Sequence, residues 1–214
     1  YYVSTFGSDS NNGLTKETAF LTLSQAVTTA TAGQTIGVLA GTYKGASNCN
    51  FTISKNLNIY GTSGTIFDGE SARRSGWILN SGYKVNIKSV SFKNGLDDYG
   101  SAIYSNSTGS ITNCTFTNNT VGWGEDGGAI YNNSTGNVTD CTFIENYTYN
   151  NGGAIYNNST GSVTDCTFLY NTANNAGGAI YNNSTGSVTY CTFTNNYADY
   201  GDAIYNFSTG RVNN

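Results

Sequence analysis

The sequence predicts an all-β protein, a parallel β-helix of about 24–27 residues per coil with a short N-terminal capping helix. The first observation is a repeat: GGAIYNNSTG occurs at residues 127–136, 152–161 and 177–186, with close variants at 100–109 and 201–210. The second is its period, because the alanines of successive copies are 27, 25, 25 and 24 residues apart. A fixed period in this range indicates stacked units, since one unit cannot bury its own apolar face.

The content of each copy indicates strands rather than helices. Apolar residues do not recur every three or four positions, and β-branched and aromatic residues dominate the short segments AIYN and SVTDCTF. Turn-forming NSTG and NN sequences separate these segments. In a parallel β-helix each copy forms one coil, and strands of successive coils pair in register about 4.8 Å apart.

Alternation along these strands predicts the core. Four side chains of one coil should point inward, with a bend between Val138 and Cys141 that resets the alternation. These four are Ile130, Val138, Cys141 and Phe143. Three of these positions form predicted columns: Ile103, Ile130, Ile155, Ile180 and Ile204; Cys114, Cys141, Cys166 and Cys191; Phe116, Phe143, Phe168 and Phe193. The intervening threonines should face solvent.

Glycine and asparagine have predicted roles at the corners of the coil. The glycine pair before each alanine permits a tight corner with positive φ. An asparagine ends each F-x-x-N motif, at a turn where stacked side-chain amides can hydrogen-bond along the axis. These asparagines are Asn119, Asn146, Asn171 and Asn196.

Toward the N-terminus the pattern becomes irregular, and one continuous domain divides into three parts. Residues 1–33 are predicted to form a cap, with a strand and an amphipathic helix at residues 17–30 that covers the first coil. Residues 34–99 form irregular coils, in which GWILN (76–80) takes the place of GAIYN. Residues 100–214 form the regular coils.

Two sets of motifs resemble known families. The opening YYVSTFGSDSNNGLTKETAFLTLSQAV resembles the start of pectate-lyase-like right-handed β-helix proteins. The GGAI and FxxN motifs resemble those of chlamydial-type polymorphic outer-membrane proteins and of adhesin-like surface proteins of methanogenic archaea. The resemblance covers nearly the whole chain and implies a right-handed coil. It also implies an extracellular or cell-surface protein with a structural or adhesive role, although a fold does not fix an activity.

Side chains that could act on a polysaccharide are few. A calcium-dependent lyase needs clustered carboxylates and a basic residue, and an inverting hydrolase needs paired carboxylates. The strongest cluster comprises Asp97, Asp98, Asp68, Glu70, Arg73 and Arg74. GLDD faintly resembles the paired-aspartate motif of polygalacturonases, but the chain contains no histidine. We therefore predict no catalytic residue, metal site or cofactor, and polysaccharide cleavage is an alternative.

Four of the five cysteines fall in one column, and Cys49 stands apart. A column places thiols along a line, whereas zinc ligands must converge on a point. Cβ atoms of neighbours in register would be about 4.8 Å apart, farther than the roughly 3.8 Å of a disulfide. We predict a buried row of thiols, with disulfides between neighbours as the alternative.

Alternation places the tyrosine after each inward isoleucine on the outer surface. This predicted ligand or partner surface is Tyr104, Tyr131, Tyr156, Tyr181 and Tyr205. Such a row could stack on sugar rings or pack against a protein, or its rings could stack on one another and stiffen the sheet. The expected partners are glycans or other cell-surface proteins. End-to-end stacking of copies into a filament is an alternative.

The exposed NNST turns contain candidate sites for N-glycosylation. Thirteen N-x-S/T sequons occur, although a chain rich in Asn, Ser and Thr produces many by chance. The candidates on the turns are Asn106, Asn133, Asn158, Asn183 and Asn206.

Composition excludes two classes of partner. A net charge of −4 with nine Lys and Arg argues against nucleic acid, and no run of 18 apolar residues predicts a membrane span. A hydrophobic content of 37%, with 14% aromatic residues, argues against disorder. The chain begins with Tyr1 and stops inside a coil, which predicts a piece of a longer protein.

Overall fold

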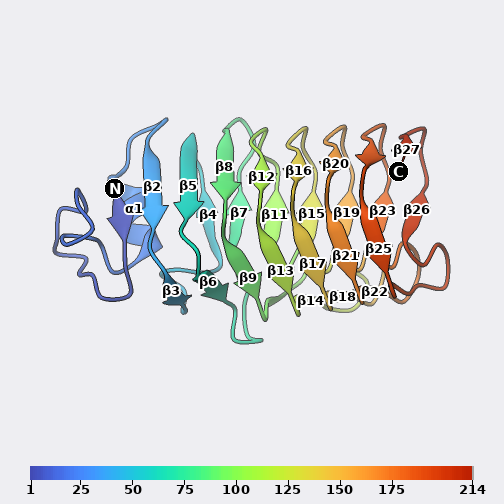
Figure 1. Ribbon diagram of the computed structural model, residues 1–214, viewed down its shortest axis with the longest axis horizontal. Coiled ribbons are helices and arrows are strands. Elements are labelled where there is room, and N and C mark those ends of the chain that lie inside the picture. The colour runs from blue at the N-terminus through green and yellow to red at the C-terminus, as the bar shows by residue number, and fades with distance from the viewer. Residues whose placement is uncertain (214) are drawn as a thin grey trace.

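The computed structural model describes residues 1–213, which form a parallel β-helix whose coils stack along one axis (Figure 1). The two ends of the chain lie at opposite ends of the stack. In each regular coil the chain visits four sheets, here named A to D, in the order C, A, B, D. Every strand pair between coils is parallel and in register, as predicted from the repeat.

Sheets A and B form two sides of each coil. Sheet A contains β1 (Tyr2–Val3), β2 (Thr35–Val38), β5 (Leu57–Gly61), β8 (Val85–Lys88), β12 (Ile111–Thr112), β16 (Val138–Thr139), β20 (Val163–Thr164), β24 (Val188–Thr189) and β27 (Val212–Asn213). Sheet B contains β3 (Gly41–Tyr43), β6 (Thr65–Asp68), β9 (Ser91–Lys93), β13 (Thr115–Thr117), β17 (Thr142–Ile144), β21 (Thr167–Leu169) and β25 (Thr192–Thr194).

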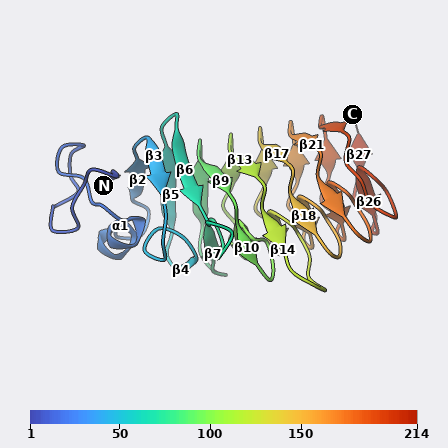
Figure 2. The same cartoon turned by 90° about the horizontal axis from the view of Figure 1, so that it is seen from below.

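Sheets C and D close the coil. Sheet C contains β4 (Phe51–Ile53), β7 (Trp77–Leu79), β11 (Ile103–Ser105), β15 (Ile130–Asn132), β19 (Ile155–Asn157), β23 (Ile180–Asn182) and β26 (Ile204–Asn206). Sheet D contains β10 (Leu96–Asp97), β14 (Thr120–Val121), β18 (Tyr147–Thr148) and β22 (Thr172–Ala173). Figure 2 shows β10, β14 and β18 following one another along the lower side of the stack.

Helix α1 (Leu23–Thr29) covers the N-terminal end of the stack of coils (Figures 1 and 2). Its N-cap Thr22 accepts a hydrogen bond from the Gln25 N–H at 3.2 Å, and Leu23 and Ala26 are buried. A capping helix is confirmed, but its predicted span of 17–30 is wrong.

The segment before α1 is irregular because a side chain holds its backbone. One carboxylate oxygen of Asp9 accepts hydrogen bonds from the N–H groups of Leu21 and Thr22, both at 2.9 Å. Phe20 meanwhile pairs with Val3 as an isolated bridge. These non-helical contacts replace the first turns of the predicted helix.

The predicted core columns are buried. Phe116, Phe143 and Phe168 stack with centroids 4.8 Å apart and planes within 6° of parallel. The isoleucine, valine and cysteine columns are also inside, except that near the C-terminal end Ile204 and Phe193 are half-buried and Val212 is exposed. Hydrophobic burial therefore follows the repeat from coil to coil.

Left-handed backbone makes the corners. The bend predicted between Val138 and Cys141 is at Asp140, whose φ is 54°. The first glycine of each pair also has positive φ, as at Gly127 (72°). The second glycine of each pair is required because there is no room for a side chain. A Cβ on Gly128 would lie 2.0 Å from the carbonyl oxygen of Gly153.

One alignment by letters differs from the structural register. The letters of GWILN align with GAIYN and predict that Ile78 pairs with Ile103, but in the structure Ile78 pairs with Tyr104 and Leu79 with Ser105. Trp77 therefore stands in the isoleucine column, one position away from the letter match. Its indole Nε1 donates to the carbonyl of Asn48 at 2.8 Å, which satisfies the buried donor.

The cysteine column is buried as predicted. The thiols of Cys114, Cys141 and Cys166 each donate to the carbonyl two residues earlier, at 3.2–3.3 Å. These three and the separate Cys49 form no disulfide, and Cys191 is buried in the same column. Burial raises the pKa of the Cys49 thiol to about 12 and that of Cys141 above its ordinary range.

Candidate functional site

The predicted tyrosine column lies on the outer face of sheet C, in register from coil to coil. Neighbouring rings lie within 14° of parallel, with centroids 5.0–5.3 Å apart. The column has five members, all of them half-buried: Tyr104, Tyr131, Tyr156, Tyr181 and Tyr205. At one end, Tyr99 packs edge-on against Tyr104 and Tyr131. The structure thus assembles all five predicted residues into one surface.

Stacking restricts what this column can bind. Tyr131, Tyr156 and Tyr181 each have a tyrosine on both ring faces, so a sugar ring cannot lie flat on them. Burial raises the pKa of Tyr131 and Tyr156 further above the ordinary value of 10.0, so their hydroxyls act as hydrogen-bond donors even in mildly alkaline solution. The column therefore offers ring edges and hydroxyl groups, which suit hydrogen bonding and edge contacts.

A hollow lies at the C-terminal end of the column. Its volume is about 220 Å³, and it is lined by Asn175, Ala176, Tyr181, Tyr200, Tyr205 and Phe207. Tyr200 and Phe207 are exposed. Aromatic walls with an amide at the edge are typical of a ligand site that combines apolar contact with hydrogen bonding. Tyr200 and Phe207 lie outside the predicted tyrosine column, and no repeated pattern in the sequence marks them.

The corner between sheets D and C carries a second aromatic group, also not identified from the sequence. Trp123 is 82% exposed, and its ring stacks on Tyr149 of the next coil at 4.3 Å with an angle of 15°. Tyr149 packs edge-on against Tyr147 at 4.9 Å. The signal in the sequence was the 27-residue spacing from Ala102 to Ala129, which exceeds the next spacing by two residues.

The loop that carries Trp123 is held by the following coil. The hydroxyl of Thr148 donates to the Glu125 carbonyl at 2.6 Å. The backbone N–H and side-chain amide of Asn151 both donate to one carboxylate oxygen of Asp126 at 3.0 Å. These hydrogen bonds to Glu125 and Asp126 fix the loop and so orient the indole ring of Trp123.

The candidate glycosylation residues lie in two different columns. Asn106, Asn133, Asn158 and Asn183 form an outer row. In this row the Nδ2 groups of Asn133, Asn158 and Asn183 donate to the Oδ1 of the preceding coil, at 2.9–3.1 Å. Asn206 instead pairs with Asn182, which belongs to an inner row. The repeat itself aligns Asn206 with Asn182, because both directly follow the tyrosine of their copy, and Phe207 replaces the second asparagine of the last copy.

The inner asparagines are structural. Asn132, Asn157 and Asn182 are buried, and each Nδ2 donates at 2.9 Å to the Oδ1 of the next coil. The predicted FxxN column has the same pairing of amides, and its members Asn119, Asn146 and Asn171 are also buried, whereas Asn196 is half-buried. Paired amides satisfy one another, which removes the cost of burying these groups.

Three of the four carboxylates considered for catalysis, Asp68, Glu70 and Asp97, are paired with cations, and Asp98 is exposed. Asp68 lies 3.5 Å from the Lys93 ammonium and 4.0 Å from that of Lys44. Burial opposes its ionisation, but hydrogen bonds from Glu70 N–H and Asn94 and the two lysines outweigh burial and lower its pKa. A carboxylate held ionised in this way is suited to an ion-pair network rather than to general acid catalysis.

Asp97 is paired with Arg74 at 3.1 Å. Arg74 is buried, and its other amino group donates to the carbonyls of Tyr99 and Gly100. The Arg74 Nε is a buried atom without a hydrogen-bond partner in the described chain. Burial lowers the pKa of Arg74 from its ordinary value, and Asp97 opposes that shift. This pair links two successive coils.

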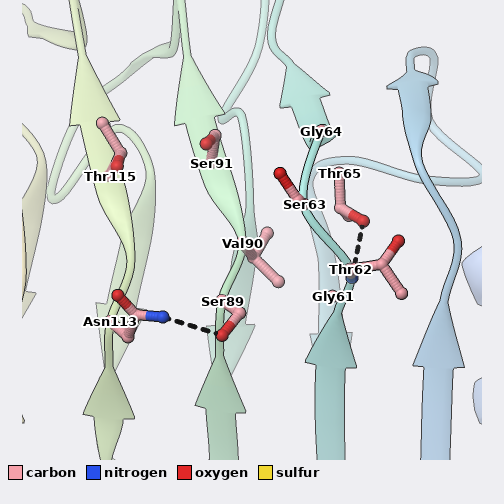
Figure 3. A pocket seen from close by; sticks show the side chains of 10 residues that line it. All are labelled: Gly61, Thr62, Ser63, Gly64, Thr65, Ser89, Val90, Ser91, Asn113 and Thr115. Carbon is pink, nitrogen blue, oxygen red and sulfur yellow. Dashed lines mark hydrogen bonds between the residues drawn. The ribbon is translucent and has the colours of Figure 1, made fainter.

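A shallow groove of about 370 Å³ follows the corner between sheets A and B (Figure 3). Its side chains are small hydroxyl and amide groups such as Ser63, Ser91, Thr115 and Asn113. The Asn113 amide donates to the Ser89 hydroxyl at 3.0 Å. No carboxylate or basic side chain lines it, so the groove lacks the groups that polysaccharide cleavage needs.

Charge is divided along the stack. Residues 1–93 contain eight Lys or Arg and four Asp or Glu, whereas residues 94–214 contain one and nine. The tyrosine column and Trp123 therefore lie in the acidic half. Within residues 1–213 no group of three or more Asp, Glu, Cys or His side chains could hold a metal ion, and the seven-residue α1 is too short to cross a bilayer.

Comparison with known proteins identifies the architecture. A family model described as "Right handed beta helix region" matches residues 42–214. Among solved structures, the chain is similar to a "Rhamnogalacturonan lyase" at 13% identity and a TM-score of 0.48, over 92% of this chain and 73% of that one. This likeness is too distant to carry an argument about activity. No curated protein sequence matches the chain.

Proposed function

We propose a non-catalytic, adhesive role at the cell surface for this chain, which belongs to the right-handed β-helix family. Attachment takes place through the corner between sheets D and C, to glycans or to other surface proteins. The observation that carries the proposal is the hollow lined by Tyr181, Tyr200 and Tyr205 at the end of a continuous tyrosine column. The repeated scaffold holds these aromatic side chains at fixed spacing, so little ordering is needed on binding.

The pairing of the carboxylates supports the non-catalytic part of the proposal. Asp68 and Asp97 are both held in ion pairs, and neither lines the groove or the hollow. If the alternative of polysaccharide cleavage were correct, the protein would release sugars from uronate polymers and Asp97→Ala or Asp98→Ala would abolish the release. We expect no turnover from the unaltered protein.

Adhesion is tested by the saturable binding of the intact chain to glycan arrays and to cells. The double variant Tyr200→Ala, Tyr205→Ala should weaken binding about tenfold, because it removes two walls of the hollow. The matched control is Tyr60→Ala, an exposed tyrosine of sheet A. Equal binding by the double variant and the control would show that the hollow is not the contact surface.

A second candidate, end-to-end self-association, is favoured by the division of charge. The basic half of one copy faces the acidic half of another when copies align head to tail. Because α1 covers the N-terminal end, such a partner would contact the helix rather than extend a sheet. Sedimentation at high protein concentration should then show assemblies that salt dissociates, and a monomer at low salt would exclude this candidate.

N-glycosylation at the outer asparagine row is part of the proposed surface location. Asn133 is exposed, and its amide has a second hydrogen beyond the one given to Asn106. Successive coils are about 4.8 Å apart, and so are equivalent atoms of neighbouring asparagines in this row. Glycans on adjacent coils would therefore collide. Mass spectrometry of native material should therefore find at most alternate members of the row modified, and none of the buried Asn132, Asn157 or Asn182.

A further inference from the structure

We infer that Trp123, braced by Tyr149, is a binding platform for a basic sugar, a glycan ring that carries a free amino group. One face of the indole lies on Tyr149, and the side chain is nevertheless 82% exposed, which leaves the other face open. This differs from the tyrosine column, whose inner rings are covered on both faces. The inference rests on the proposed adhesive function and assigns it a ligand class.

The surroundings of the platform favour a sugar over a protein. Protein hot spots are enriched in Trp, Tyr and Arg, but they lie in well-packed and desolvated pockets near the centre of an interface. Trp123 instead projects from a loop of Gly122, Gly124, Glu125 and Asp126, beside the amide of Asn150. The open face of the ring can contact the C–H face of a sugar, while Glu125 and the Asp126 carboxylate, which is hydrogen-bonded to Asn151, place negative charge on the same loop.

Charge selects the kind of sugar. Residues 94–214 have a formal charge of −8, and Glu125 and Asp126 are on the same loop as Trp123. Arg211, near the opposite end of this segment, is its single basic side chain. A cation is attracted both by this field and by the face of an indole, the best cation–π acceptor among side chains. A uronate polymer would be repelled by the same field.

The platform is preorganised. Asn150 donates to the Gly124 carbonyl at 3.4 Å, and Thr148 and Asn151 hold the two acidic residues of the loop. Tyr149 is itself fixed edge-on by Tyr147, whose hydroxyl donates to Asn174 at 3.1 Å. A ring that is already oriented loses little conformational entropy when a ligand covers it.

Tryptophan fluorescence of the full chain reads this site directly. The second tryptophan, Trp77, is completely buried, so acrylamide quenching and ligand-induced shifts report Trp123. Oligomers of glucosamine should protect Trp123 from acrylamide, N-acetylglucosamine oligomers of equal length should bind more weakly, and galacturonate oligomers should not bind. Calorimetry should show glucosamine-oligomer affinity about tenfold lower for Trp123→Ala, with Trp123→Phe intermediate.

The control variant is Tyr190→Asn, which changes an exposed tyrosine of the acidic half at the corner between sheets A and B. Its affinity should equal that of the unaltered chain. Equal affinity in Trp123→Ala, or galacturonate binding as tight as glucosamine binding, would overturn the inference. Oligolysine that protects Trp123 as well as glucosamine oligomers do would show that the site recognises charge rather than a sugar, which also overturns it.

The inference and the proposed function can fail separately. If the Trp123→Ala variant still adheres to cells and binds glucosamine oligomers as before, Trp123 is not the binding platform, but the adhesive role is retained. Glucosamine binding that depends on Trp123 in a chain that attaches to no cell removes the adhesive role and leaves the platform.

Discussion

The side-chain amide of Asn146 donates to the Oδ1 of Asn171 at 2.9 Å, and both residues are completely buried. The same Nδ2 donates to the Phe116 carbonyl at 3.0 Å, and the Oδ1 accepts from the backbone and side chain of Asn119. Each buried amide in the row is thus connected to two coils.

This relationship predicts a large stability loss in Asn146→Leu. The leucine has similar size but leaves several buried polar groups on three coils without partners, which should lower the free energy of unfolding by about 3–5 kcal/mol. Urea unfolding followed by circular dichroism measures the loss. Asn133→Leu, in the exposed row, is the control and should cost less than about 1 kcal/mol. Equal losses in the two variants would contradict the role of buried pairing.

Tyr190→Asn should stabilise the protein. Tyr190 has φ of 55°, a left-handed conformation that bulky residues rarely adopt, and it is 71% exposed. Asn113 occupies the equivalent corner of an earlier coil with φ of 51°. We expect a gain of about 0.5–1 kcal/mol in thermal or urea unfolding. Tyr60→Asn, an exposed tyrosine within a strand, should give no gain.

The buried thiols should resist modification. Cys49, Cys114, Cys141 and Cys166 are at most 2% exposed, and burial raises the pKa of Cys49 and Cys141. Under native conditions at pH 8 these four should not react with a thiol reagent, and after denaturation without a reductant they should all react. Fewer reactive thiols after denaturation would support the alternative of disulfides along the column.

Alkaline pH should destabilise the fold through Tyr43. This side chain is 1% exposed, and its hydroxyl donates to the Leu39 carbonyl at 2.8 Å. Burial raises its pKa from 10.0 to about 12, so the folded state holds the proton more tightly than the unfolded state. The contribution of Tyr43 to the free energy of unfolding is fully present below pH 10 and is lost as the pH rises through 12.

Tyr43→Phe tests this pH dependence. The decline in the free energy of unfolding between pH 10 and 12 should be about 1–2 kcal/mol smaller in the variant. Tyr190→Phe is the matched control, since its side chain is exposed, and its decline should equal that of the unaltered protein. The same slope in all three proteins would contradict the assignment to Tyr43.

The repeat made much of the fold predictable, because hydrophobic alternation and a constant period leave few ways to bury Ile130 and Phe143. The extent of the capping helix was not predictable in the same way. A distant side chain, Asp9, takes the backbone N–H groups of Leu21 and Thr22 and so prevents the first helical turns. Local propensity contains no information about that contact.

The candidate surface was predicted in part. The tyrosine column follows from alternation, since Tyr131 comes directly after the inward Ile130. Trp123 occurs once and outside the repeated motif, so no periodic pattern marks it. Its contact with Tyr149 connects two coils, and only the stacking of those coils brings the rings together.

The sequence by itself determined the coil, its period, its core columns and the outward direction of the tyrosines. Each of these follows from alternation within a strand and from the equivalence of successive repeats. The tertiary structure decided how the buried polar groups are satisfied, because an inner amide such as that of Asn132 finds its hydrogen-bond partner on the next coil. It also decided that the inner tyrosine faces are covered and one indole face is open, since ring stacking depends on distances between coils that composition and spacing do not specify.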